Sequence, residues 1–255
     1  MDYKLLESIN STSDVKALSQ NDVEKLCYEI RQFLIEKVKQ SGGHLASNLG
    51  VVELSVAMHR VFDSPSDHII FDVGHQCYVH KLLTGRREMF DKLRTPGGLS
   101  GFTSRRESEH DAFGAGHSST SISAALGFAE SDRIQGKSSH TVAVVGDGAF
   151  TGGLIHEAIN NCKRDLRLVI ILNENGMSIS TNNGAFASYL SEFRASQKYI
   201  AAKNTTRSVL NSIPLIGKPI ANCISASKNF LKRVVYTTAS PFLRWLWSWS
   251  WPSCP

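Results

Sequence analysis

The stretch GDGAFTGGLIHEAINNCKRDLRLVIILNEN, residues 146–175, decides the fold of this chain. The apolar run VAVV at 142–145 precedes it, and a second apolar run, LVIIL at 168–172, lies near its end. Both runs are typical of buried strands, and the segment between them reads as a helix. A strand, a helix and a second strand in this order predict two parallel strands whose carboxyl ends lie side by side.

Polar residues stand at both of these strand ends. Asp147 lies between two glycines after the first strand, and Asn175 follows the second. A carboxylate and an amide oxygen brought together there make a site suited to Mg²⁺ carrying a diphosphate, and Met177 can add its backbone carbonyl. A tight turn alone explains a GDG tripeptide about as often as a metal site does, but NENGM after the second strand favours the metal. The layout is that of a thiamine-diphosphate anchor, with Asn173 as a structural residue.

Histidines beside glycines mark two further turns. GHLASNLG contains His44, and DVGHQCYVHK contains His75, which follows an apolar strand. Because imidazole titrates near neutrality, both histidines suit proton transfer or hydrogen bonding to a diphosphate or a hydroxyl substrate. A packed or solvated histidine is an equally open alternative at each position. We expect His80, by contrast, to lie inside a helix with a structural role.

The segment GAGHSSTSIS, residues 114–123, places Gly116, His117 and Ser118 at the start of a helix. Backbone N–H groups at a helix start favour anions or the polar edge of a ligand. The alternative is a simple capped helix whose small residues allow close packing.

The rest of the chain alternates helical and extended patterns. The expected helices are 23–40, which Ser19 or Asn21 can cap, 51–62, 118–135 and a polar stretch at 187–235, and 68–74 is a further buried strand. Strands that alternate with helices predict an α/β fold, a parallel sheet flanked by helices. The glycine-rich segment 95–116 is expected to be a long loop, functional or mobile.

Composition limits the function. Hydrophobic content of 42% and charged content of 20% over 255 residues are ordinary for a globular protein. The net charge of +5 is scattered, with no block of Lys and Arg among aromatics, so we expect no nucleic-acid partner. Five widely spaced cysteines without a CxxC pair indicate reduced thiols. With no basic-then-apolar leader and no apolar run of 18 residues, we expect a cytoplasmic protein without a membrane span.

Four blocks resemble the 1-deoxy-D-xylulose-5-phosphate synthase family: GGHLASNLGVVELSVAMHRVF, FDVGHQCYVHKLLTGR, GGLSGFTSRRESEHDAFGAGHSSTSISAALG and VAVVGDGAFTGGLIHEAINN…LNENGMSIS. Transketolase shares the GDG…N anchor, but the SGFTSRRESEHDAFGAGHSSTS block is similar to the synthase. The resemblance covers residues 1–237 and implies an N-terminal domain with the thiamine-diphosphate-binding fold. It implies a homodimeric transferase that condenses pyruvate with glyceraldehyde 3-phosphate, releases CO₂ and makes 1-deoxy-D-xylulose 5-phosphate for isoprenoid, thiamine and pyridoxal synthesis.

The resemblance also implies roles for single residues. Asp147 and Asn175 match Mg²⁺ ligands, with Met177 contributing its carbonyl. His44 and His75 match catalytic positions, and His44 handles protons near the substrate. The cofactor contacts that it implies are His75, Gly116, His117, Ser118, Gly148, Ala149 and Asn175.

The chain departs from the family pattern after Thr237. Family members continue with a pyrimidine-binding domain and a third domain, whereas residues 238–255, TASPFLRWLWSWSWPSCP, carry all four tryptophans and are not expected to form a domain. A frame-shifted coding end or a membrane-interface anchor would account for this tail. Two interpretations stay open. The chain is a truncated synthase, or it is a diphosphate-binding domain that is catalytically inactive or is the N-terminal subunit of a split transketolase-like enzyme with a partner chain.

Overall fold

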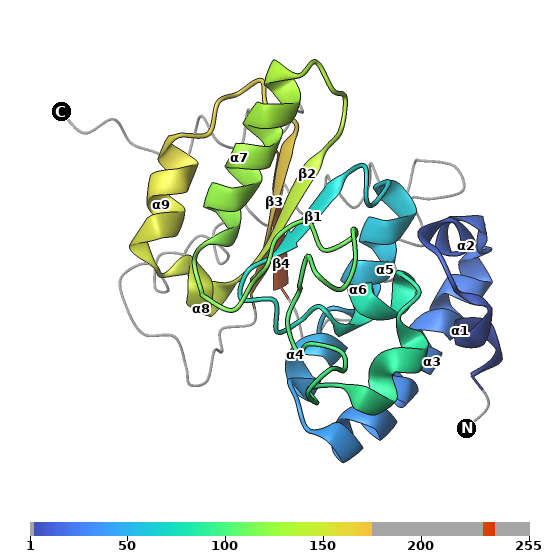
Figure 1. Ribbon diagram of the computed structural model, residues 1–255. Coiled ribbons are helices and arrows are strands. Elements are labelled where there is room, and N and C mark those ends of the chain that lie inside the picture. Colours follow the sequence, from blue (N-terminus) through green and yellow to red (C-terminus); the bar gives the residue numbers. More distant parts are fainter. Residues whose placement is uncertain (1–2, 175–231, 238–255) are drawn as a thin grey trace.

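The apolar runs of the sequence form the centre of a sheet. The computed structural model describes residues 3–174 and 232–237, so the predicted ligands Asn175 and Met177 and the tail 238–255 lie outside it. Within these ranges the sheet has the order β1-β2-β3-β4, as Figure 1 shows. Its strands are β1 (His68–Phe71), β2 (Thr141–Gly146), β3 (Leu168–Glu174) and β4 (Lys232–Thr237). The first three strands are parallel, which confirms the predicted fold class.

Strand β4 differs from the expectation. It pairs antiparallel with β3, whereas the sequence pattern predicted helix up to residue 235. The segment KRVVYT is rich in β-branched and aromatic residues, which favour an extended backbone beside a strand that is open to pairing. The rest of the predicted 187–235 helix lies outside the described residues.

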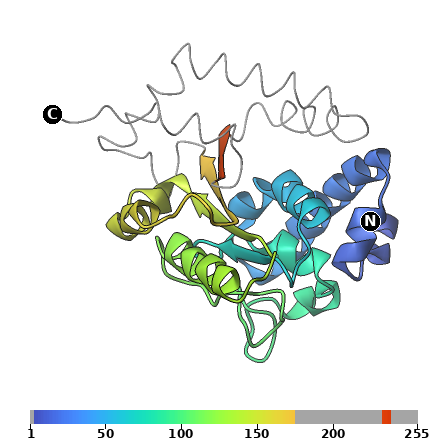
Figure 2. The ribbon, with the colours of Figure 1, turned by 90° about the horizontal axis from the view of Figure 1, so that it is seen from above.

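The parallel strands are buried on both faces, and successive side chains alternate between two cores. One core lies under α3 (Gln20–Ser41), α5 (Val52–Val61) and α6 (Tyr78–Leu83) and includes Phe71 and Val144. The other lies under α7 (Ser121–Ile134) and α9 (Gly153–Asn160) and includes Ile70, Ala143 and Val145. Figure 2 shows the sheet between these two groups of helices. Double-sided burial explains why the strands read as continuous apolar runs.

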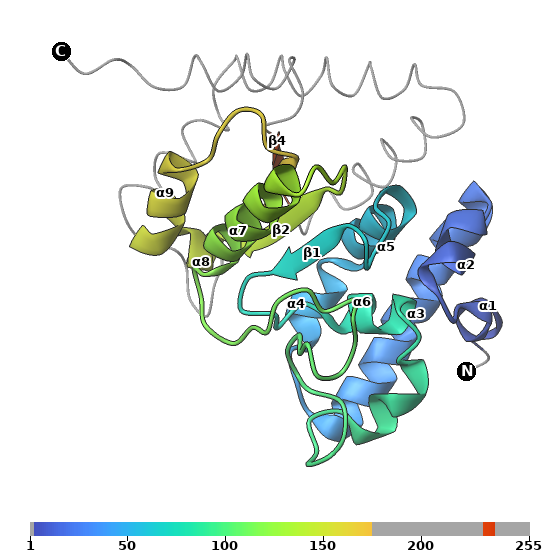
Figure 3. The same ribbon diagram turned by 45° about the horizontal axis from the view of Figure 1, so that its top comes forward.

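The remaining elements are short: α1 (Lys4–Ser8), α2 (Thr12–Ala17), α4 (Leu45–Leu49), the 3₁₀ helix η1 (Arg87–Lys92) and α8 (Asp147–Phe150). Helix α1 packs against α3 and α2 packs against α5, and Figure 3 shows both on the side of the molecule away from α7 and α9. The Ser19 hydroxyl caps α3 by accepting a hydrogen bond from the Asp22 N–H at 3.3 Å, as one of the two predicted caps required. The predicted helix after Asp147 is divided into α8 and α9, because Thr151 and Gly152 lie between them and Gly152 has an extended backbone.

The 95–116 segment is anchored by ion pairs. Lys81, which is fully buried in α6, donates to Glu107 at 2.5 Å. Arg86 donates to both carboxylate oxygens of Asp111, at 2.9 and 2.8 Å. Asp111 also accepts from the Ser104 N–H at 2.7 Å. Buried charges are tolerated when they are paired in this way, so a segment without regular structure is held in a defined conformation.

Two buried histidines extend this network. The Nε2 of His59 lies 2.9 Å from the Nδ1 of His80, whose own Nε2 lies 3.1 Å from Asp111. Burial lowers the pKa of both histidines, so both are neutral. The Nε2–H of His59 then donates to His80, and the Nε2–H of His80 donates to the carboxylate of Asp111. Burial alone would raise the pKa of Asp111, but hydrogen bonds from His80 and Arg86 outweigh it and hold that pKa well below its usual range. His80 is therefore structural, as predicted.

Stability should fall as the pH is lowered from about 7.5 to about 5.5. Below about pH 6.5 the unfolded chain takes up protons that His59 and His80 cannot accept in the fold, which costs up to about 1.4 kcal/mol per histidine and pH unit. Asp111 stays ionised over this range and does not add to the slope. Urea unfolding at several pH values measures how the free energy of unfolding changes with pH. His59→Gln should reduce this pH dependence, and the exposed control His156→Gln should leave it unchanged.

Candidate functional site

The turn after β1 places His75 at the carboxyl edge of the sheet. Val73 and Gly74 both have positive φ angles, 60° and 84°, a conformation that is costly for valine. A Cβ on Gly74 would lie 3.0 Å from the Cβ of Ala115 and 3.2 Å from the N of Thr103, so the space and the positive φ both favour glycine. The turn thus packs tightly against the 95–116 segment. Backbone strain of this kind concentrates at functional sites.

Asn48 holds the two predicted catalytic histidines together. Its fully buried side chain donates to the carbonyl of His44 at 2.7 Å and to the carbonyl of His75 at 2.8 Å, and it accepts from the Tyr78 N–H at 2.8 Å. The two imidazole rings lie edge to face, with centroids 5.6 Å apart. The structure therefore brings His44 and His75 into contact from separate segments.

Both histidines are neutral near pH 7. Burial lowers the pKa of His44, and the positive charge of Arg94 lowers it further. Burial also lowers the pKa of His75, helped by His44 and opposed by Asp72. The Nδ1 atoms of His44 and His75 are buried, with no hydrogen-bond partner among the described residues. A neutral imidazole can accept a proton or donate one, as proton transfer requires.

The loop before α7 is joined to the turn after β2. Gly116, His117 and Ser118 are exposed, and the next residue, Ser119, is buried with a φ of 70°. The Ser119 hydroxyl donates to the carbonyl of Ala149 at 2.7 Å. The predicted cofactor-contacting residues of the α7 loop and of the GDG turn therefore lie next to each other.

Asp147 begins α8 directly after β2 and is nearly buried, with 8% of its surface exposed. Its carboxylate accepts from the N–H of Gly148 at 2.9 Å. In the sheet register Gly146 pairs with Asn173, so the ends of β2 and β3 meet as predicted. The Oδ1 of Asn173 is buried and has no hydrogen-bond partner in the described ranges, and Asn175 lies two residues further on.

Metal ligation stays a prediction. The described residues contain no group of three or more His, Cys, Asp or Glu side chains that could hold a metal ion. Two of the three predicted ligands, Asn175 and Met177, lie outside those residues. The predicted ligands include a side-chain amide and a backbone carbonyl. Neither kind of ligand belongs to a cluster of His, Cys, Asp and Glu side chains.

The loop before α7 and the turn after β2 leave open space beside their glycines, as a diphosphate would require. A Cβ added to Gly114, Gly116 or Gly146 would meet nothing within 4 Å, so the backbone there faces open space. Gly116 has a φ of 144°, which side-chain-bearing residues rarely adopt. Exposed backbone N–H groups at such positions can approach phosphate oxygens closely. The loop that contains Gly116 is fixed to the Asp147 turn through Ser119, so both surround one region.

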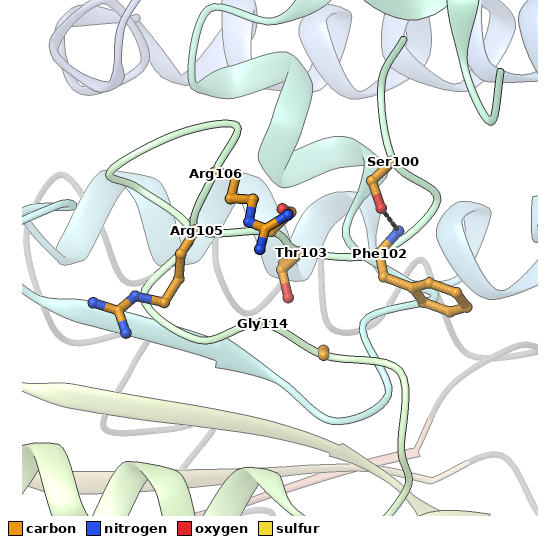
Figure 4. Close-up of a pocket in the computed structure, with 8 residues that line it drawn as sticks. Ser100, Phe102, Thr103, Arg105, Arg106 and Gly114 are labelled. Carbon is orange, nitrogen blue, oxygen red and sulfur yellow. Dashed lines mark hydrogen bonds between the residues drawn. The ribbon is translucent and has the colours of Figure 1, made fainter. Parts of the chain in front are cut away.

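A hollow of about 380 Å³ lies beside this region, within the 95–116 loop (Figure 4). Phe102 lines the hollow, and the centroid of its ring lies 5.7 Å from the centroid of the His44 imidazole. Figure 4 shows Arg106 reaching toward Thr103, while Arg105 points away from both. Both arginines are exposed, so the hollow presents positive charge to solvent.

The sequence prediction missed three residues of this arrangement: Asn48, Asp72 and Ser119. Asn48 and Ser119 lie inside blocks that were singled out for their histidines. Asp72 precedes VGH at the end of a strand, the same signal that identified Asp147. Its position at a strand end could have identified Asp72 as a candidate residue of the site.

Together these features define an α/β protein whose parallel sheet is flanked by helices and carries its candidate site at the carboxyl edge. A solved structure, the transketolase from Leishmania mexicana, is similar in fold, with a TM-score of 0.53 over 66% of this chain and 30% of its own. The sequence identity is 20%, so the likeness concerns the fold alone.

The family follows from the sequence. A family model described as 1-deoxy-D-xylulose-5-phosphate synthase matches residues 6–245. Synthases of that name from Caldanaerobacter subterraneus and Syntrophomonas wolfei are each 54% identical over 91% and 90% of this chain, and that of Treponema pallidum is 49% identical over 92%. The chain belongs to the 1-deoxy-D-xylulose-5-phosphate synthase family. It spans 37%, 36% and 38% of the lengths of these three relatives.

Among the helices of the described residues, none is both long enough and apolar enough to cross a membrane.

Replacing Asn48 by alanine should destabilise the fold by about 2–3 kcal/mol, because it leaves the buried N–H of Tyr78 without its acceptor. It should also perturb the NMR signals of both His44 and His75. Urea unfolding and histidine NMR spectra measure the two effects. Asn161→Ala is the matched control, because Asn161 makes an exposed hydrogen bond to the carbonyl of Glu157. It should cost less than about 0.5 kcal/mol, and equal costs for the two variants would contradict the role of Asn48.

Proposed function

We propose that this chain supplies the diphosphate-binding and metal-binding part of a thiamine-diphosphate-dependent 1-deoxy-D-xylulose-5-phosphate synthase. The reaction condenses pyruvate with glyceraldehyde 3-phosphate, releases CO₂ and gives 1-deoxy-D-xylulose 5-phosphate. Membership of the family supports the activity. One structural observation supports the site: the nearly buried Asp147 follows β2, and Ser119 joins that turn to the exposed loop 116–118.

Different residues of the chain would bind the metal ion and the diphosphate. Asp147 would hold Mg²⁺ together with Asn175 and the carbonyl of Met177, and the diphosphate would lie against the backbone of Gly116 and Gly148. Thiamine diphosphate, when bound, supplies an electron sink for decarboxylation of the ketoacid. The residues of the chain would anchor its diphosphate.

His44 and His75 would move protons near the substrate. Because burial keeps both imidazoles neutral, either can take a proton from a hydroxyl group at physiological pH. Asn48 holds the backbone carbonyls of both residues, and their rings lie edge to face.

The same proposal includes the assembly and the compartment. Residues 1–237 form the cofactor-binding domain, and 238–255 lie outside it. The assembly is a homodimer, or a complex with a partner chain that supplies further domains. The cytoplasm is the compartment, and the free thiols of Cys27, Cys77 and Cys162 support a reducing environment.

Asp147→Ala should weaken Mg²⁺-dependent binding of thiamine diphosphate at least about tenfold, or about 1.4 kcal/mol. The reason is the loss of the carboxylate that would hold the metal. Isothermal titration with and without Mg²⁺ measures the affinity, and Asp165→Ala serves as the control because Asp165 is exposed. Equal affinity of wild type and Asp147→Ala would exclude this anchor.

Product formation tests whether the chain is catalytically active by itself. A synthase makes deoxyxylulose 5-phosphate from pyruvate and glyceraldehyde 3-phosphate, whereas a diphosphate-binding subunit binds the cofactor without turnover. We expect the isolated chain to bind cofactor and to form no product by itself. Turnover by the isolated chain would contradict that expectation and favour the complete activity.

A further inference from the structure

We propose that Asp72 is a positioning residue that fixes the loop 116–118 for the diphosphate and holds it against the turn of Asp147. This inference rests on the proposed function, because it assigns the loop to the cofactor. The hydrogen bonds of Asp72 are independent of that assignment and can be tested separately.

The carboxylate of Asp72 accepts hydrogen bonds from residues at the start of α7. Its Oδ1 accepts from the N–H of Ser119 at 2.8 Å, and its Oδ2 accepts from the N–H of Ser121 at 3.0 Å and from the hydroxyl of Ser121 at 2.6 Å. Only 1% of Asp72 is exposed, and no ion pair to it is found in the described part of the chain. A buried carboxylate needs such donors, and the amide end of a helix supplies them.

The backbone of Asp72 shapes the turn of His75. Its carbonyl accepts from the N–H of Gly74 at 2.6 Å and from the side chain of Gln76 at 3.2 Å. Its own N–H donates to the carbonyl of Val144 in β2 at 2.8 Å. One residue therefore contacts the His75 turn through its backbone and the α7 loop through its side chain.

The side chain acts through Ser119. That residue has a φ of 70°, which costs energy for a serine and needs support from its surroundings. Asp72 holds its N–H, and the carbonyl of Ala149 holds its hydroxyl. A Cβ on Gly152 would lie 2.1 Å from that hydroxyl oxygen, so the contact with the Asp147 turn leaves no spare room. The exposed residues 116–118 directly precede Ser119, which these hydrogen bonds hold in place.

Asp72→Asn keeps the size of the side chain but replaces one acceptor oxygen by an NH₂ group. That group must face either the N–H of Ser119 or the two donors of Ser121, so at least one hydrogen bond is lost. We expect the amide protons of Ser119 and Ser121 to exchange at least about tenfold faster. We also expect Mg²⁺–thiamine diphosphate to bind at least about tenfold more weakly.

The matched control is Asp132→Asn, at the other end of the same helix. Asp132 is also buried, with 5% of its surface exposed, and it bonds to His68 at 3.0 Å and to the hydroxyl of Ser139 at 2.6 Å. It should lose stability in urea, while cofactor affinity and the exchange rates at Ser119 and Ser121 stay as in wild type. If Asp72 only stabilised the fold, Asp72→Asn would leave the cofactor affinity of the folded protein unchanged, as we expect for Asp132→Asn.

Ser121→Ala keeps the test decisive if Asp72→Asn does not fold. It removes only the 2.6 Å hydrogen bond to Asp72 and leaves the carboxylate in place. We expect about threefold weaker binding and faster exchange at Ser119, since one link to the carboxylate is lost.

The outcomes separate the two proposals. Unchanged exchange rates in folded Asp72→Asn overturn the positioning role whether or not the cofactor binds. Faster exchange with unchanged affinity overturns it as well, because the loop would then not serve the cofactor. A wild-type chain that binds no thiamine diphosphate defeats the proposed function, and the exchange rates still report on the hydrogen bonds of Asp72.

Discussion

Parallel pairing of β1, β2 and β3 is the constraint on which the rest of the structure depends. Hydrogen bonds between these strands align their carboxyl ends, so the segments that follow them emerge at one edge of the sheet. The His75 turn follows β1, and Asp147 follows β2. The edge is built by strands that are apolar on both faces, which leaves polar groups only where the strands end.

Buried polar side chains then fix the loops at this edge, where no regular hydrogen-bond pattern is available. Asn48 connects two histidine segments, and Asp72 connects β1 to the start of α7. Asp111 and Glu107 hold the long loop through Arg86 and Lys81. Each of these groups costs free energy to bury and is stabilised only by specific partners. The site is therefore ordered by hydrogen bonds and ion pairs, while the apolar cores supply the platform beneath it.

The sequence predicted most of the fold, because hydrophobic periodicity reports burial. Helix α3, helix α5 and the three parallel strands lie where the pattern placed them. Strand β4 was predicted as helix, since a short segment rich in valine and tyrosine takes its conformation from the strand beside it. In the site, Asp147 and His75 follow β2 and β1 at the predicted edge, and the His44 ring lies against that of His75. Asn175 and Met177 lie outside the described residues, and their metal ligation stays a prediction.

By itself the sequence determined the order of strands and helices and the chemical groups at the strand ends, because both are local properties of the chain. Only the tertiary structure decided which distant residues meet. Asp72 and Ser119 are separated by 47 positions and Asn48 and His75 by 27, and no local pattern in either segment names the other. Their contacts exist because two helix-covered faces and one sheet edge bring those segments together. The carboxylate after β1 thereby became a structural partner of the α7 loop, while Asp147, a similar residue after β2, remained beside the open backbone of the site.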